Sequence, residues 1–395
     1  MTSPRLALSV LAACIALAAC QSGEPAPQAP AATEAAKADA TPSYEREPDE
    51  LDEDALLAEA GTPHQVVAEA FSSVDVPEDN VDSLASWVAG DGRTWLIATA
   101  KEGEQGLVVY DGDTGERLRG VGTVGGDLGQ FNRPNGIFVH GDYLFVVERD
   151  NQRVQVLALP GFEALGSFGE AVLEKPYGLW LRELPDQTLE VLVTDAYMAG
   201  EDAMGEDIVP PVAELDRRIQ RFIVTTNARA VTARHAGSLG DTSEAGAIRI
   251  PESLWGDVAS DRLLVAEEDE ATGTALREYS LADGFLGRTH GLDTFGAQAE
   301  GIALWACGDG SGYWIATDQF KDRSLFHVFD RVTLEPRGAF AGQAVANTDG
   351  VWLHQAGTKR FPAGVFYAVH DDMGVAAFDW RDVAKALDLR ADCGA

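Results

Sequence analysis

The chain of 395 residues carries 64 acidic and 30 basic side chains, which gives a formal net charge of −34. Such a surface repels the phosphate backbone of nucleic acid, so we expect no nucleic-acid partner. It also repels a polyphosphorylated small molecule unless bound cations reverse the local sign. Its hydrophobic content of 45% is ordinary for a globular protein with a sizeable core. Its length exceeds that of a usual single-core domain, so we expect several domains or one large repeat architecture.

The first predicted element is an export signal at residues 1–19. Arg5 precedes an apolar run that ends in Leu17-Ala18-Ala19-Cys20, and this run is too short for a mature membrane-spanning helix. The ending resembles the lipobox of bacterial lipoproteins, whose cysteine is lipidated. We therefore expect lipidation at Cys20 and an exported protein anchored at the periplasmic face of the outer membrane or at the cell surface. A plain secretory signal is the alternative.

A flexible linker is predicted at residues 20–60, which are rich in Ala, Pro and acidic residues and almost lack aromatic ones. The folded domain is predicted at 61–395, and we expect it to be a monomer whose only membrane contact is the lipid anchor. Cys307 and Cys393 remain as cysteines of this domain. The sequence leaves open whether they pair, because it does not show the distance between them.

Short β-type runs, bounded by Gly, Asp or Asn, follow from about residue 80. They recur as strand pairs at a period of roughly 50 residues, which is typical of a four-stranded propeller blade. The six predicted pairs are Trp95–Ala100 with Gly106–Asp111, Tyr143–Glu148 with Arg153–Leu159, Leu189–Asp195 with Arg218–Val224, Arg262–Glu268 with Leu276–Leu281, Tyr313–Asp318 with Leu325–Asp330, and Val365–Asp371 with Gly374–Trp380. The sequence therefore predicts an all-β protein, a six-bladed β-propeller of four-stranded blades.

A second repeat precedes each pair: a polar or aromatic residue, then Gly or Ser, then an apolar strand. Its six copies begin at Asp82, Asn135, Tyr177, Glu252, Glu300 and Asp349. Equivalent positions of a propeller lie on one ring around the axis, so these side chains are predicted to meet at one mouth of the channel. Four carboxylates and an amide suit a hard cation such as Ca²⁺.

The following strand of each blade returns to the same mouth, so its end is expected to add charged groups there. These ends carry Lys101, Arg149, Asp195, Glu267-Glu268-Asp269, Asp318-Gln319 and His370-Asp371-Asp372.

Several segments resemble signature segments of the β-propeller phytases. They are Gly106–Asp111, Val265–Glu270, Ala299–Gly301, Asn347–Gly350 and the closing stretch Gly364–Trp380. The resemblance implies a six-bladed propeller in which calcium ions hold the phosphates of inositol hexakisphosphate and a calcium-bridged water attacks phosphorus. It implies that the substrate is a small-molecule phosphate ester.

The resemblance also assigns roles to individual residues. The implied calcium ligands are Asp82, Glu252, Glu268, Glu300 and Asp349. Lys101 and Arg149 would hold phosphate oxygens and, with Glu268, form the catalytic set. Asn135 and Gln319, at the same mouth, are expected to contact the substrate as well.

Some positions depart from the phytase pattern and keep alternatives open. Ser83, Gln298 and Gln343 stand where the family has acids, and Ala196 stands near the position where the family has a phosphate-binding lysine in the third blade. The segment from Gly129 to Val156 resembles an NHL repeat, which favours a non-catalytic, calcium-stabilised binding propeller. A gluconolactonase-like hydrolase with a single metal ion is the other alternative.

Overall fold

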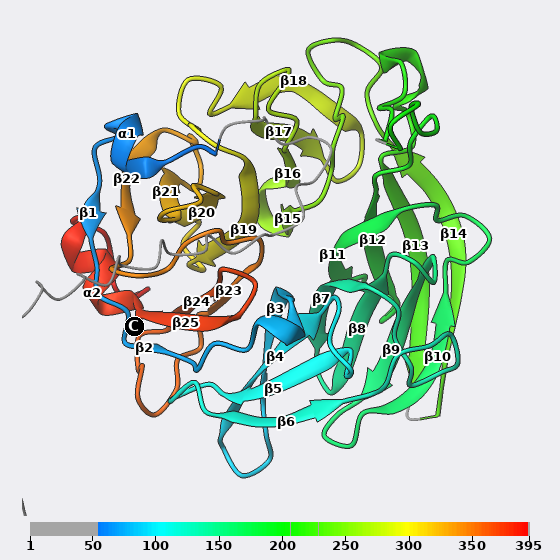
Figure 1. Ribbon diagram of the computed structural model, residues 1–395, viewed down its shortest axis with the longest axis horizontal. Coiled ribbons are helices and arrows are strands. Elements are labelled where there is room, and N and C mark those ends of the chain that lie inside the picture. The colour runs from blue at the N-terminus through cyan, green and yellow to red at the C-terminus, as the bar shows by residue number, and fades with distance from the viewer. Residues whose placement is uncertain (1–53, 206, 228, 394–395) are drawn as a thin grey trace, which may run out of the picture. The chain divides into compact units, whose positions relative to one another are not determined.

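A computed structural model describes residues 54–205, 207–227 and 229–393. The predicted signal peptide, Cys20 and most of the predicted linker lie outside these residues. The described residues belong to a unit that runs from Arg46 to Ala395, and they form six sheets. The sheets follow one another around a central axis (Figure 1), which confirms the six-bladed propeller.

Blades 1 to 4 each form an antiparallel sheet whose strands follow chain order from the axis outwards. Blade 1 contains β3 (Val81–Val88), β4 (Thr94–Ala100), β5 (Leu107–Asp111) and β6 (Arg117–Val121). Blade 2 contains β7 (Pro134–His140), β8 (Tyr143–Glu148), β9 (Arg153–Ala158) and β10 (Glu163–Phe168). Blade 3 contains β11 (Pro176–Glu183), β12 (Leu189–Asp195), β13 (Ile219–Asn227) and β14 (Ala230–Leu239). Blade 4 contains β15 (Leu254–Asp257), β16 (Arg262–Glu267), β17 (Ala275–Ser280) and β18 (Gly284–His290).

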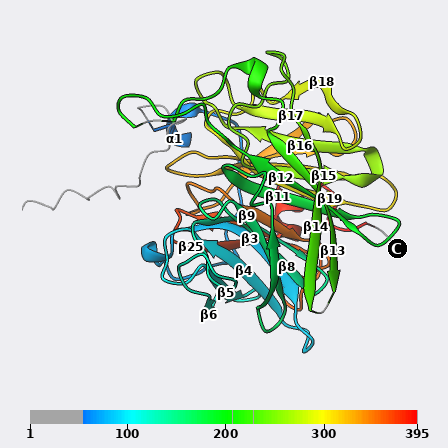
Figure 2. The ribbon, with the colours of Figure 1, turned by 90° about the vertical axis from the view of Figure 1, so that its right-hand side faces the viewer.

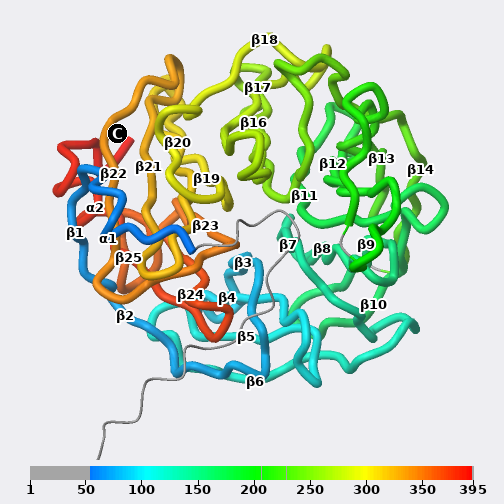
Figure 3. Tube along the Cα trace, turned by 45° about the horizontal axis from the view of Figure 1, so that its top comes forward, coloured from blue at the N-terminus to red at the C-terminus, as the bar shows by residue number. Residues whose placement is uncertain are grey.

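The last two blades recruit short strands from the start of the domain. Blade 5 contains β19 (Ala299–Ala306), β20 (Gly312–Asp318), β21 (Leu325–Asp330), β22 (Pro336–Ala341) and the parallel β1 (Gln65–Val66). Blade 6 contains β23 (Val351–His354), β24 (Val365–His370), β25 (Gly374–Asp379) and, as its outermost strand, β2 (Phe71–Ser72). Figure 3 shows β1 and β2 beside β22 and β25. The ring is therefore closed by pairing segments from the two ends of the domain.

The helical elements are short. They are α1 (Leu57–Ala60), α2 (Trp380–Ala386) and the 3₁₀ turns Pro77–Asp79, Val212–Glu214 and Val258–Ser260. All twelve strands predicted as pairs are present, with ends within three residues of those predicted. Figure 2 turns the ring onto its edge, with β13 and β14 of blade 3 towards the viewer.

The core lies between neighbouring blades. Phe326 of blade 5 packs edge-on against Phe366 of blade 6, with ring centroids 5.0 Å apart, and both are fully buried. Helix α2 stacks Trp380 on Trp305 of blade 5 at 5.5 Å. Cys393, beyond this helix, forms a disulfide with Cys307, so the pairing that the sequence left open is present.

Candidate functional site at the channel mouth

The six ring residues stand where the inner strand of each blade begins. In blades 1, 2, 3 and 5 the register with the next strand shifts at this point, as between Val81 and Leu84. Such a bulge inserts extra residues into one strand and re-aims their side chains. It explains how a buried strand presents a polar residue to the channel.

The Gly or Ser of the repeat allows neighbouring blades to approach closely. A Cβ on Gly178 would lie 2.1 Å from the carbonyl oxygen of Glu252 in the next blade. A Cβ on Gly350 would lie 2.4 Å from the carbonyl oxygen of Asp82, which closes the ring between blades 6 and 1. The small residue therefore positions the ring residue of the following blade.

Asp82 is the centre of one half of the ring. It is fully buried, and its Oδ2 accepts hydrogen bonds from the Asn135 amide at 3.2 Å and the Tyr177 hydroxyl at 3.0 Å. The Ser83 hydroxyl donates to the other oxygen at 2.8 Å. The ammonium of Lys101 lies 3.3 Å from Oδ2. Ring residues of blades 1, 2 and 3 thus meet on a single carboxylate.

Lys101 links this group to Asp349 of blade 6, whose Oδ2 also lies 3.3 Å from the Lys101 ammonium. The Gln319 amide donates to Asp349, and the Lys321 ammonium donates to Gln319 at 3.0 Å. Burial raises the pKa of the Asp349 carboxyl well above its usual range; the neighbouring Lys101 charge lowers it, and Asp372 and Asp82 raise it. The mouth therefore combines acids and lysines in one buried network.

Three glutamates form a second cluster, which includes the ring residues Glu252 and Glu300. Glu252 and Glu268 come from blade 4 and Glu300 from blade 5. One carboxylate oxygen of each lies within 4.8 Å of the others, and Glu268 and Glu300 are only 1% and 5% exposed. Like charges held so close and so buried repel one another, so a divalent cation would stabilise them.

Not every acid at the strand ends turns towards the channel. Asp195 accepts hydrogen bonds from the main-chain N–H of Glu174 and Lys175, at 3.2 and 2.8 Å. Glu267 and Asp318 bind main-chain N–H groups of the loops before β15 and β19 in the same way. The expectation that these three acids add charge to the mouth is therefore wrong: they fasten the loops that lead to the inner strands.

Arg149 follows the end of β8 and forms an ion pair with its neighbour Asp150, at 2.9 Å. Its side chain is about one-quarter exposed. Its predicted role in holding phosphate stays a prediction.

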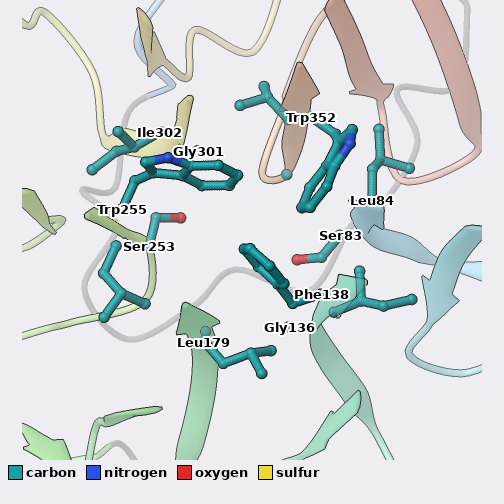
Figure 4. A pocket seen from close by; sticks show the side chains of 15 residues that line it. Ser83, Leu84, Gly136, Phe138, Leu179, Ser253, Trp255, Gly301, Ile302 and Trp352 are labelled. Atoms are coloured by element: carbon teal, nitrogen blue, oxygen red, sulfur yellow. The ribbon is translucent and has the colours of Figure 1, made fainter. Parts of the chain in front are cut away.

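Aromatic side chains fill the channel beneath the ring. Phe138, Trp255 and Trp352 each stand three residues after a ring residue, in blades 2, 4 and 6, and point towards one another (Figure 4). Their ring centroids are 5.1 to 5.6 Å apart. They leave a cavity of only ≈ 50 Å³, lined by the Gly, Ser and apolar positions of the repeat. This cavity cannot pass a substrate-sized molecule, so the ring is reached from its own mouth.

Comparison with known proteins finds neither a matching family model nor a matching curated protein. The β-propeller domain of Cps50 (Swd1) from Myceliophteria thermophila is similar in structure, at 12% identity and a TM-score of 0.43, covering 78% of this chain and 98% of that one. Hydrazine synthase from Kuenenia stuttgartiensis is similar at 11% identity and a TM-score of 0.39, covering 85% and 86%. A chain of a nidogen/laminin complex is similar at 15% identity and a TM-score of 0.41, covering 67% and 81%.

Within the described residues, no helix has the length and apolar character needed to cross a membrane. Sequence reasoning missed Lys321 altogether. It lies three residues beyond Asp318, the last residue of β20, so the strand pattern offered no signal for it.

Proposed function

We propose that this propeller is a calcium-dependent phosphomonoesterase that hydrolyses phytate or a related phosphate ester. The observation that carries the proposal is the cluster of Glu252, Glu268 and Glu300, whose carboxylate oxygens approach within 4.8 Å at the channel mouth. The resemblance of the surrounding sequence segments to the β-propeller phytases supplies the substrate class.

The residues present fit calcium. Ca²⁺ binds six to eight oxygen atoms, mostly from carboxylates and carbonyls, in a flexible geometry. Three carboxylates at one mouth provide the charged part of such a set, and Asp82 and Asp349 are further candidates in the same ring. Calcium bound there would neutralise substrate phosphates and activate a water molecule for attack.

The chain itself would bind and orient the ester. Lys101 lies between two carboxylates, so its ammonium is held at the mouth, where it would contact a phosphate oxygen. Lys321 is held nearby through Gln319 and adds a second positive charge. Phosphoryl transfer depends mainly on positioning and charge neutralisation, which such groups supply.

The direct test is phosphate release from phytate during a calcium titration. Release should require Ca²⁺ and disappear when a chelator is added. Glu268→Gln should reduce both calcium binding and release, while Glu163→Gln, which changes an exposed acid of β10, should alter neither. No release at any calcium concentration would reject the proposal.

A non-catalytic, calcium-stabilised binding propeller is the second candidate. Both oxygens of Asp82 already have protein partners, which favours a smaller metal set than the resemblance implies. In this case calcium would raise the melting temperature, as any ligand of the native state does, without any ester being hydrolysed. Calorimetry and the phosphate assay on the same sample separate the two.

Lipidation at Cys20 completes the proposal by placing the enzyme on a membrane. Incorporation of a labelled fatty acid into the full-length protein, lost in Cys20→Ser, would support it. Equal labelling of the wild type and Cys20→Ser would reject lipidation at Cys20 and would leave the proposed enzymatic activity unaffected.

A further inference from the structure

A polar cavity lies among the outer strands of blade 4. It has a volume of ≈ 630 Å³ and is bordered by the segment before β15, the β16–β17 turn and strands β17 and β18. Its lining includes Arg249, Arg277, Thr272 and Thr289. We propose that this cavity binds a small tetrahedral oxyanion of the phosphate class. It shares no residue with the carboxylate cluster at the mouth, so the inference does not rest on the proposed function.

Arg277 supplies a buried guanidinium with donors to spare. Its residue is 5% exposed, and Nη1 donates to the Thr289 hydroxyl at 3.0 Å and to the Ala245 carbonyl at 3.3 Å. Nη2 stays 3.7 Å from the Glu267 carboxylate, and Nε has no acceptor among the described residues. A buried cation that is only partly paired is costly, and an oxyanion would supply the missing acceptors.

Arg249 supplies the second guanidinium, which faces an acid that is easily displaced. Its Nη2 donates to Glu244 at 2.8 Å, while its Nε stays 3.8 Å from Asp269. The Glu244 side chain is 81% exposed, and such surface pairs contribute little stability. The Glu244 carboxylate therefore occupies one end of the cavity as a weak competitor of an incoming anion.

The other acids nearby are directed at the main chain. Glu267 accepts hydrogen bonds from the N–H groups of Arg249 and Ile250. Asp269 accepts from the N–H of Ala271 and from the Thr272 hydroxyl. These bonds offset the negative charge behind the cavity. The Thr289 hydroxyl donates to the Ala245 carbonyl at 3.3 Å, so the two guanidiniums form the donor set for the oxygens of a tetrahedral anion.

Binding of inorganic phosphate to the full chain, stripped of metal with a chelator, tests the proposal by isothermal titration calorimetry. Without metal, the glutamate cluster cannot recruit phosphate, and the variants of Arg249 and Glu244 show whether the signal comes from this cavity. We expect one phosphate per chain. Arg249→Gln should weaken binding by about tenfold or more, because one charge-assisted contact is lost. Glu244→Gln should tighten it, because the competing carboxylate is removed.

The controls separate this site from the mouth. Arg337→Gln, which removes an exposed arginine of blade 5, and Glu268→Gln should both bind phosphate as the wild type does. Loss of binding in Glu268→Gln would overturn the proposal, and so would the absence of binding to the metal-free protein. The Glu244 side chain is exposed, so we expect Glu244→Gln to fold as the wild type does. If neither Glu244→Gln nor Arg249→Gln changes the affinity for phosphate, the site is also excluded.

The nature of the anion is tested with glycerol phosphate and acetate in place of phosphate. Binding of glycerol phosphate would identify a site for phosphate monoesters, and its exclusion would identify a site for the free ion. Acetate binding as tight as phosphate would contradict a tetrahedral preference and overturn the assignment.

Discussion

Gly178 of blade 3 faces the main-chain carbonyl of Glu252 in blade 4, and a Cβ on Gly178 would lie 2.1 Å from that oxygen. The packing of blade 3 against blade 4 at this contact therefore sets the position of Glu252, a candidate metal ligand. The same relationship recurs between Gly136 and Tyr177 and between Gly301 and Asp349. The geometry of the ring therefore depends on residues that carry no chemistry of their own.

Gly178→Ala should destabilise the protein by about 1–3 kcal/mol, because the added methyl group forces two backbones apart. It should also weaken calcium binding, because Glu252 must move. Urea unfolding and calcium calorimetry measure the two effects. Gly90→Ala is the matched control, since a Cβ at Gly90 would meet nothing within 4 Å. Equal losses in both variants would contradict a role for the inter-blade contact.

Lys101→Met should leave Asp82 and Asp349 without their shared cation. Removing one partner from a buried ion pair costs about 3–5 kcal/mol, because the remaining charge stays desolvated. Adding Asp349→Asn to this variant removes one of the two acids and should restore part of the loss. Denaturation of the single and double variants in chelator checks this. An Asp349→Asn change that alters stability equally with and without Lys101 would show that Lys101 and Asp349 do not interact.

The strand order could be predicted because each blade repeats two independent signals. Apolar runs bounded by turn residues identified β4 and β5 and their equivalents, and the small residue after the ring position marked the inter-blade contact. The placement of Glu252 and Glu300 on the ring and of Glu268 at the same mouth followed from this phase.

Other features could not be predicted because they depend on single-residue register. Glu267 is the last residue of β16 and binds a loop, while Glu268, one residue beyond the strand, joins the carboxylate cluster. Strands β1 and β2 contain two residues each and leave no pattern in the sequence. Their pairing with β22 and β25 is set by where the ring closes.

His354 should make stability fall at acidic pH. Its Nε2 donates to the Gly357 carbonyl at 3.2 Å, and its Nδ1 shares a hydrogen bond of 2.8 Å with the Ser86 hydroxyl, which is the donor when the ring is neutral. Burial lowers the pKa of His354 below its usual value of about 6.5. The unfolded chain therefore binds the proton more tightly, and the stability that His354 contributes is complete above this value and lost as pH falls through it.

Urea unfolding of the wild type and of His354→Gln at about pH 7.5 and about pH 5.5 isolates this contribution, since the other titrating groups are common to both. The wild type should lose more stability on acidification than the variant. Equal losses would show that His354 does not titrate differently in the folded protein.

The disulfide between Cys307 and Cys393 should stabilise the end of the chain against blade 5. It joins residues 86 positions apart, and the loop it closes contains β23, β24 and β25 of blade 6. Removing a native disulfide typically costs about 2–5 kcal/mol. Cys307→Ala with Cys393→Ala should therefore lower the unfolding free energy by about that amount.

The same double variant should keep its calcium site. Because the stacking of Trp380 on Trp305 does not depend on the disulfide, the ring should stay closed and calcium binding at the mouth should persist. Loss of calcium binding in the double variant would instead show that the positions of the calcium ligands depend on the disulfide.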